Sequence, residues 1–169
     1  MIEILQILSF LILPIFSFII LIFFGKRLKE HSSTLALTLI GIMLLNAIIL
    51  FVNSFSHSSD HHWSIHKTFE WFSTGNLTLD LGYYVDSITS IMLLVVALIG
   101  FLVHLYSTEY MKGDLRYSRY FAFLGIFIFS MNGIVLADSL IMMYIFWELV
   151  GLSSFLLIGF WFEKDKPPK

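Results

Sequence analysis

The sequence contains no cysteine, so this chain can form neither disulfide bonds nor thiolate sites for zinc or iron–sulfur clusters. Charge is also scarce: Asp, Glu, Lys and Arg make up 13% of 169 residues, and the formal net charge of −2 argues against a nucleic-acid partner. Phosphate-binding loops, dinucleotide fingerprints and nucleophile elbows do not occur. We therefore expect no cofactor, no metal site and no directly bound soluble substrate, and we assign no redox or hydrolytic chemistry to this chain.

Apolar residues dominate instead, at 58% of the chain, and the mean hydropathy is +0.87. Charged residues divide the sequence into apolar blocks that each reach the roughly 17–25 residues needed to cross a bilayer as a helix. The blocks lack the alternation of barrel strands, so helices are the expected spanning form. The sequence thus predicts an all-α integral membrane protein, a single transmembrane domain over residues 1–169 with about five helices. They are expected near 2–24, 33–53, 86–107, 119–137 and 139–162.

The segment between the second and third predicted helices, residues 54–85, is polar and differs from the rest of the chain. Alternating residues over 69–81 predict a short β-hairpin that turns at Gly75-Asn76. Four histidines in this segment have a spacing that could suit a metal, but without cysteines or a carboxylate pattern a solvated loop is the favoured interpretation. These histidines are His57, His61, His62 and His66.

The distribution of basic residues predicts the orientation of the chain in the membrane. Lys and Arg gather between the first and second helices, between the third and fourth, and after the fifth, whereas Lys67 alone lies in the 54–85 loop. Because basic loops stay on the cytoplasmic side, we expect a cytoplasmic C-terminus and an N-terminus and 54–85 loop outside. The expected location is the cell's inner (cytoplasmic) membrane.

Glu148 is the only charged residue of the fifth apolar block and lies near the middle of its helix. A charge at that depth costs about 2.5–3.5 kcal/mol on insertion scales, so the group must be neutral, paired or in contact with water. No Lys or Arg lies at that depth; Glu148 is therefore either protonated or paired with a cation on another chain or on a continuation of this one. Both options suit proton transfer, and a helix-packing glutamate is the alternative. The face around it predicts an interior position: Tyr144, Gly151, Leu152, Phe155 and Gly159.

Other polar residues within the predicted helices have less specific interpretations. His104, toward the cytoplasmic end of the third helix, could relay protons or could be an interfacial histidine. Asn46 and Asn132 are mid-helix amides, for which interhelical hydrogen bonds are favoured over support of a water chain. Pro14 should kink the first helix slightly.

Polar residues at the predicted helix ends have structural explanations. Asp138-Ser139 is expected to cap the fifth helix, where a side-chain oxygen satisfies free backbone amides. Lys112, Arg116 and Arg119 are interpreted as topology determinants and lipid-headgroup contacts, not as a substrate site.

Several stretches carry a resemblance to a known family, above all the run from Trp147 to Trp161. The others are the runs His104–Met111, Arg119–Phe123, Phe129–Met131 and Leu136–Leu140. They resemble subunit 5 of the proton-pumping NADH:quinone oxidoreductase, an antiporter-like subunit of respiratory complex I. The resemblance is strong over about 84–162 and is limited to the apolar pattern and loop placement over 1–83. It implies that Glu148 matches a proton-channel glutamate coupled to a lysine on a later, broken helix.

The same resemblance implies that flavin, iron–sulfur and quinone chemistry belong to other subunits. It makes the other membrane subunits of complex I, the lipid bilayer and protons the expected partners. Family members have many more helices, so the expectation is an N-terminal portion of a longer protein. The large subunit of a multisubunit sodium/proton antiporter is an alternative, although Val150-Gly151-Leu152 and the run from Met111 to Asp114 favour complex I. A non-transporting membrane scaffold is the third possibility.

Overall fold

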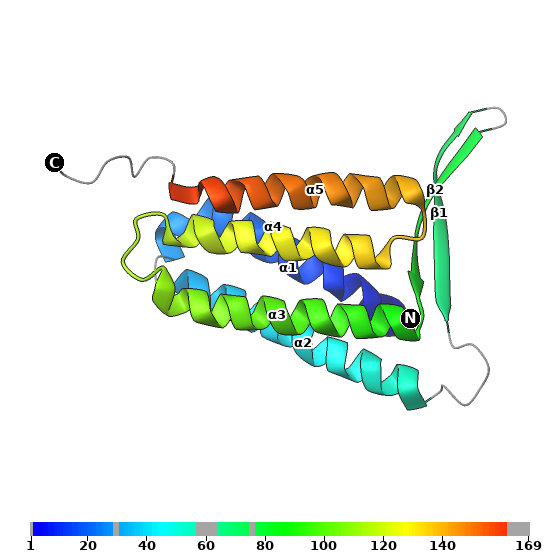
Figure 1. Ribbon diagram of the computed structural model, residues 1–169, viewed down its shortest axis with the longest axis horizontal. Coiled ribbons are helices and arrows are strands. Elements are labelled where there is room, and N and C mark those ends of the chain that lie inside the picture. The colour runs from blue at the N-terminus through cyan, green and yellow to red at the C-terminus, as the bar shows by residue number, and fades with distance from the viewer. Residues whose placement is uncertain (1, 29–30, 57–63, 75–76, 162–169) are drawn as a thin grey trace.

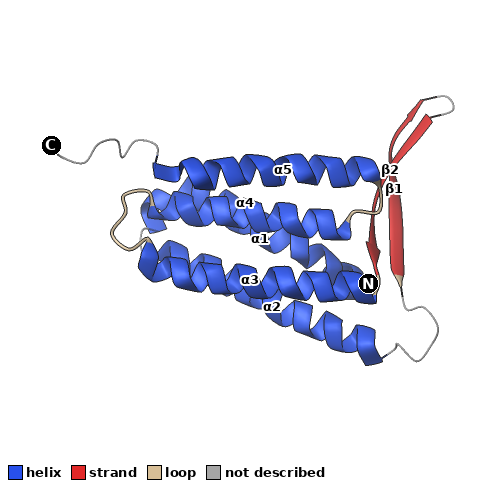
Figure 2. Cartoon of the chain, viewed as in Figure 1, coloured by secondary structure: helices blue, strands red, loops and turns tan. Residues whose placement is uncertain are grey.

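The computed structural model of this chain describes residues 2–28, 31–56, 64–74 and 77–161. In these residues the chain forms five long helices, one antiparallel hairpin and a final 3-10 turn (Figure 2). The elements are α1 (Ile2–Leu28), α2 (His31–Ser56), β1 (Ile65–Thr74), β2 (Leu77–Val85), α3 (Ser87–Tyr110), α4 (Tyr117–Leu136), α5 (Leu140–Ile158) and η1 (Gly159–Trp161).

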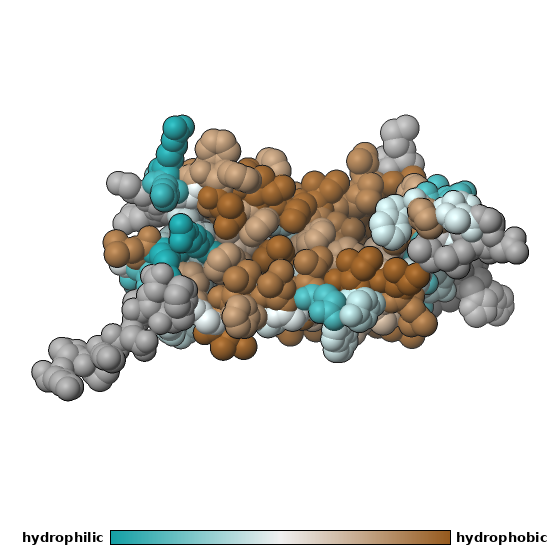
Figure 3. All heavy atoms as spheres, turned by 90° about the horizontal axis from the view of Figure 1, so that it is seen from above, coloured by the Kyte–Doolittle hydropathy of each residue, from teal (hydrophilic) through white to brown (hydrophobic). Residues whose placement is uncertain are grey.

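All five helices are long and apolar enough to cross a membrane, which confirms the predicted all-α membrane fold. Several extend beyond the predicted ends; α1, for example, continues through Lys26 and Arg27. Charged residues bound the hydrocarbon-spanning part of a helix, but a helix continues freely into the headgroup region, where water can solvate its side chains. Figure 3 shows apolar side chains along the visible face of the bundle, with hydrophilic ones mainly toward its two ends.

The helices form a bundle in which α4 has a central place (Figure 1). Helix α1 packs against α4 and α2, α2 packs against α3, and α5 packs against α4. The core between the first four helices is closed by side chains such as Ile7, Phe10, Ile40, Met43, Ala47, Leu93, Ala97 and Ile128. Small residues among them let the backbones approach closely, which favours helix association in lipid.

A buried amide on α4 donates a hydrogen bond to a backbone carbonyl of α1 that has no partner within its own helix. Pro14 lies inside α1 and has no N–H, so the carbonyl of Phe10, four residues earlier, loses its partner within the helix. Asn132 of α4 donates a hydrogen bond from Nδ2 to that carbonyl at 2.8 Å. Both Phe10 and Asn132 are fully buried. The proline is therefore compatible with the membrane because a neighbouring helix satisfies the carbonyl that it frees.

The other mid-helix amide also joins two helices. Asn46 of α2 donates from Nδ2 to the Gln6 carbonyl of α1 at 3.0 Å and to the Ser9 hydroxyl. Gln6 donates in return to the Asn46 carbonyl at 3.5 Å. The favoured interpretation of Asn46 and Asn132 as interhelical hydrogen-bonding residues is confirmed.

The predicted hairpin is present and longer than expected. Strands β1 and β2 pair antiparallel from Ile65↔Val85 to Thr74↔Leu77, with a bulge between Glu70 and Phe72. The turn predicted at Gly75-Asn76 lies outside the described residues. The hairpin stands at the end of the bundle opposite the link between α3 and α4 (Figure 1). A bridge between Tyr83 and Ala137 attaches it to the α4–α5 junction.

Candidate functional site

The helix that carries Glu148 begins with a defined cap. The Ser139 hydroxyl accepts a hydrogen bond from the Met142 amide at 3.3 Å and is the N-cap of α5. Asp138, which was expected to share this capping role, instead contacts His66 of β1. The capping prediction is therefore confirmed for Ser139 and is wrong for Asp138.

Helix α5 attaches to α4 by one narrow face. The Phe146 ring lies directly on Gly133, where an added methyl group would collide with it. Phe146 also contacts Phe129 edge-on, with 5.4 Å between ring centroids. Farther along the same face, Ser153 and Phe160 are buried. Because these residues recur at helical spacing, they fix the side of α5 that faces α4.

Glu148 lies on the opposite side of α5. It is two residues from Phe146, which places it about 200° around the helix, and it is exposed. Its expected neighbours Tyr144, Leu152 and Phe155 are 65%, 52% and 72% exposed. The Tyr144 hydroxyl lies close enough to the Glu148 carboxylate to interact with it. The expected interior position is therefore not provided by the described helices, because α5 packs through its other face.

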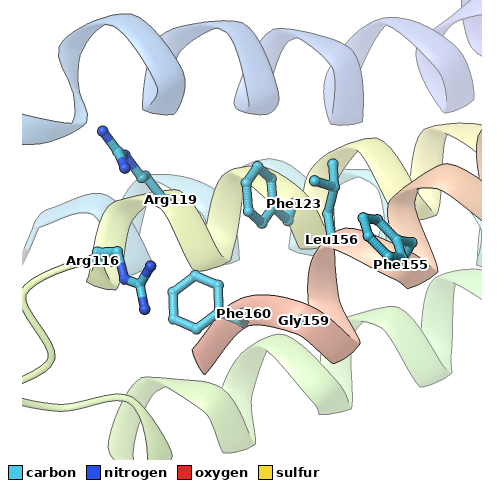
Figure 4. Close-up of a pocket in the computed structure, with 7 residues that line it drawn as sticks. All are labelled: Arg116, Arg119, Phe123, Phe155, Leu156, Gly159 and Phe160. Carbon is cyan, nitrogen blue, oxygen red and sulfur yellow. The ribbon is translucent and has the colours of Figure 1, made fainter. Parts of the chain in front are cut away.

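The two glycines on the Glu148 face have no close neighbour in the described part of the chain either. There, an added Cβ at Gly151 or Gly159 would meet no atom of another segment within 4 Å. Toward the C-terminal end of α5 the surface beside this face is hollowed into a pocket of about 370 Å³. Figure 4 shows Arg116, which directly precedes α4, and Arg119 of α4 at one end of this pocket, and Phe155 of α5 at the other. This face thus has the features of a helix-packing surface: glycines that allow another backbone to come close, and an apolar hollow that side chains could fill.

His104 is buried in the described structure, and its role as a proton relay or as an interfacial histidine stays a prediction. It is 0% exposed, its ring lies 5.8 Å from that of Phe121, and its Nδ1 lies 2.8 Å from the Gly100 carbonyl of the same helix. Since a carbonyl only accepts, Nδ1 carries the proton in this contact and Nε2 of the neutral ring is an acceptor. Among the described residues Nε2 has no hydrogen-bond partner.

The basic residues between α3 and α4 lie at the end of the bundle where α1 also ends. Lys112 forms an exposed ion pair with Glu109 at 3.1 Å, and the Arg116 guanidinium lies 5.1 Å from the centre of the Phe160 ring. Lys112, Arg116 and Arg119 also line a second pocket, of about 750 Å³, together with Thr108. Their interpretation as topology and headgroup residues stays a prediction.

Three of the four loop histidines, His57, His61 and His62, lie outside the described residues. The fourth, His66, lies on β1 and contacts Asp138. Among the described residues no group of three or more His, Cys, Asp or Glu side chains could hold a metal ion. The absence of metals and cofactors from this chain stays a prediction.

Comparison with known proteins places this chain beside one family. Residues 71–121 match the family model for the "NADH-Ubiquinone oxidoreductase (complex I), chain 5 N-terminus". Residues 137–167 match the model "NADH:quinone oxidoreductase/Mrp antiporter, TM". The second match includes Glu148.

Curated relatives extend the likeness over most of the chain. The chloroplastic NAD(P)H-quinone oxidoreductase subunit 5 of Mesostigma viride is 39% identical over 137 residues, 81% of this chain and 20% of that protein. That of Coffea arabica is 41% identical over 139 residues, 82% of this chain and 18% of that protein. The chain thus spans about a fifth of the length of these relatives. The likeness also reaches beyond residues 84–162, where the resemblance was expected to be strong.

A solved structure shows the same fold at low identity. One chain of the membrane-bound sulfane sulfur reductase, an archaeal respiratory membrane complex, superposes with a TM-score of 0.67 at 15% identity. The match covers 89% of this chain and 29% of that chain. At this identity the comparison supports the helical arrangement alone.

Proposed function

Since this chain belongs to the subunit 5 family of NADH:quinone oxidoreductases, as an N-terminal portion, we propose that it is part of a proton-translocating, antiporter-like membrane subunit. It would couple electron transfer in other subunits to proton movement across the membrane. Flavin, iron–sulfur and quinone chemistry would stay with those subunits.

The observation that carries this proposal is the position of Glu148. It lies mid-way along a membrane-spanning helix, on a face that the described residues leave open. In hydrocarbon a bare carboxylate there would cost about 2.5–3.5 kcal/mol. A further membrane element packed on this face would remove that cost if it supplied a cation or water. A carboxyl group held between the two charge states is suited to accept and release a proton.

The surroundings of this carboxyl group support such an arrangement. Gly151 and Gly159 would let another helix approach α5 closely. Tyr144, whose hydroxyl lies near the carboxylate, offers a donor to its charged form. We infer that the covering element belongs to the same membrane complex and carries a lysine, as the family resemblance implies. Other membrane subunits and the lipid bilayer complete the proposed surroundings.

His104 is proposed as a relay between the basic end of the bundle and the membrane interior. Its Nε2 is buried and available as an acceptor. Thr108, one helical turn later on α3, lines the pocket of about 750 Å³ at the basic end. Water in that pocket would be the proton donor for the imidazole, since histidine is the side chain best suited to exchange protons near neutral pH.

The chain is a multi-pass membrane protein, and its relatives above are chloroplastic. A finer location, the cytoplasmic membrane with the basic end facing the cytoplasm, belongs to the proposal. It rests on the gathering of Lys and Arg at one end, which fits the positive-inside rule.

Substitution of Glu148 tests the function. Glu148→Gln keeps the size and hydrogen-bonding capacity of the side chain but cannot ionise. We expect this variant to assemble and to lower the rate of proton pumping in vesicles by at least several-fold. Glu148→Asp retains a carboxyl group and should keep part of the activity, and Glu70→Gln removes a carboxylate from the hairpin as a matched control. Native pumping rates in Glu148→Gln would remove this residue from the mechanism.

The sodium/proton antiporter alternative has one observation in its favour, because the model matched by residues 137–167 covers Mrp antiporters as well. The curated relatives above are quinone oxidoreductase subunits, which favours the first function. Sodium-dependent transport without quinone reduction would support the alternative. Full activity of Glu148→Leu would instead support a non-transporting scaffold.

A further inference from the structure

A contact between the hairpin and the start of α5 joins two distant parts of the sequence. His66 Nε2 of β1 lies 3.2 Å from Asp138 Oδ2 in the short link between α4 and α5. The His66 side chain is 53% exposed, whereas that of Asp138 is 6% exposed. Asp138 directly precedes Ser139, the N-cap of α5. Whatever holds Asp138 therefore holds the first turn of the helix that carries Glu148.

The fit of the two surfaces shows that this approach is close. A Cβ added at Gly82 of β2 would collide with the Asp138 carboxylate and with the Lys67 carbonyl. Tyr83, the next residue, forms the bridge with Ala137. Only a residue without a side chain fits between the hairpin and the link. The hairpin thus contacts the link before α5 in three ways: by the Tyr83–Ala137 backbone bridge, by the close approach at Gly82, and by the His66 imidazole.

We propose that His66 and Asp138 are positioning residues that form a proton-responsive clamp on the outer end of α5. An imidazolium attracts the Asp138 carboxylate, whereas a neutral imidazole contributes only a hydrogen bond. Histidine ordinarily changes charge between about pH 5 and pH 8. Among the described residues, the buried Oδ1 of Asp138 has no hydrogen-bond partner, so this carboxylate is poorly compensated without a nearby cation. Acid therefore tightens the clamp.

The half-exposed imidazole of His66 lies at the hairpin end of the bundle, where the compartment on that side can reach it. Under the proposed function, on which this consequence rests, that is the compartment into which protons are released. Accumulated protons would then hold the start of α5 more firmly and change the position of Glu148 on that helix. The clamp would make transport sensitive to the pH on the side of release.

The other titratable groups around the His66–Asp138 contact are not placed to produce the proposed pH response. Tyr84 lies edge-on to the imidazole, with 5.7 Å between ring centroids. Burial raises the pKa of Tyr83, so its hydroxyl stays neutral over the relevant range. Lys67 is the next residue on β1 and therefore points to the opposite face of the hairpin. The acidic groups of the strands and of the α3 N-terminus are Glu70 and Asp80, which face each other across the hairpin, and Asp86, which accepts from the Thr89 amide at 2.7 Å.

Because this chain has no cysteine, two spin labels can be placed selectively on the purified chain before it is assembled with the other subunits. Ser73→Cys on the hairpin and Leu140→Cys at the start of α5 are exposed positions. Their distance distribution is measured by electron–electron double resonance in the assembled complex, without turnover, at outer pH of about 8 and about 6. We expect the closed population to rise about 1.5- to 5-fold at the lower pH, the range of an exposed ion pair.

The His66→Gln variant should lose this pH response, and Gly82→Ala should lose it by forcing the hairpin away from Asp138. Lys67→Gln is the matched control and should retain the native response. An unchanged distribution in the native chain, or a full response in His66→Gln, would overturn the proposal. The pH profile of pumping provides the second readout, since His66→Gln should flatten its dependence on outer pH.

The measurement also separates the clamp from the proposed function. Glu148→Gln leaves His66 and Asp138 intact and should show the native pH response of the label distance. If that response is present while Glu148→Gln pumps normally, the clamp stands and the role of Glu148 fails. If Glu148→Gln stops pumping and the native distance is insensitive to pH, the function stands and the clamp fails.

Discussion

The hydrogen bond from Asn132 to the Phe10 carbonyl gives a quantitative prediction, because a single residue, Pro14, leaves that carbonyl without a donor in its own helix. Pro14 cannot donate to Phe10, so Asn132 supplies the missing donor at 2.8 Å. Replacing Asn132 with Leu, which has a similar volume, leaves a buried carbonyl without a partner. Replacing Pro14 with Ala restores the N–H within the helix. The two substitutions should therefore be strongly coupled.

The expected magnitude follows from the environment of the bond. Interhelical hydrogen bonds in membranes average about 0.6 kcal/mol and reach about 1.7 kcal/mol, whereas an orphaned buried acceptor costs about 1–3 kcal/mol. Asn132→Leu should thus lower the free energy of unfolding by about 1–3 kcal/mol in the native background. In the Pro14→Ala background the Phe10 carbonyl stays paired, and the same change should cost less than about 1 kcal/mol. The coupling energy should be about 1–2 kcal/mol.

The assay is a double-mutant cycle on the purified chain, unfolded with SDS in mixed micelles and followed by tryptophan fluorescence. Asn46→Leu is the matched control, because Asn46 bonds to the Gln6 carbonyl, which lies outside the reach of the Pro14 defect. Its coupling to Pro14→Ala should stay within about 0.3–0.5 kcal/mol of zero. A similarly small coupling between Pro14 and Asn132 would refute this explanation of the buried amide.

Three further predictions concern other parts of the chain. Asp86→Ala removes the oxygen that accepts from the Thr89 amide at 2.7 Å, so α3 should lose about 1 kcal/mol of stability in the same SDS assay, and Asp86→Asn should recover most of it. Gly133→Leu places a side chain where the Phe146 ring lies, so α5 should detach from α4 and proteolysis of the α4–α5 link should accelerate. Gly151→Leu is the control in the isolated chain and should not have this effect, because the space around Gly151 is open in the described structure. His104→Leu should slow proton pumping if the imidazole relays protons. The free energy of unfolding should change by less than about 1.5 kcal/mol, because an apolar side chain of similar size also fits the buried site.

The sequence was most informative about membrane insertion. Apolar blocks with at most one charged residue located all five helices, because each Lys, Arg, Asp or Glu within hydrocarbon is heavily penalised. The ends were less predictable, as α1 shows by continuing through Lys26 and Arg27. Alternation also located the hairpin, although its strands extend to Ile65 and Val85 because strand pairing continues wherever backbone partners are available.

Contacts between distant residues were beyond the reach of sequence patterns. Asp138 was expected to cap α5, but its carboxylate turns to His66, a partner that only the folded hairpin brings near. Likewise, the need for Asn132 could be inferred from Pro14 only once α1 and α4 were known to be adjacent. The side of α5 that packs on α4 was not predictable from periodicity, since the helix is apolar nearly all around. The contact of the Phe146 ring with Gly133 is visible only in the folded bundle.

The most direct test of the central claim is whether the Glu148 carboxyl group itself changes protonation during turnover. Infrared difference spectra of the working complex report the carbonyl stretch of protonated carboxylic acids. We predict a difference band that appears with turnover, shifts when the glutamates are carbon-13 labelled, and disappears in Glu148→Gln but not in Glu70→Gln. The same band at full intensity in a turning-over Glu148→Gln complex would show that protons move without this residue.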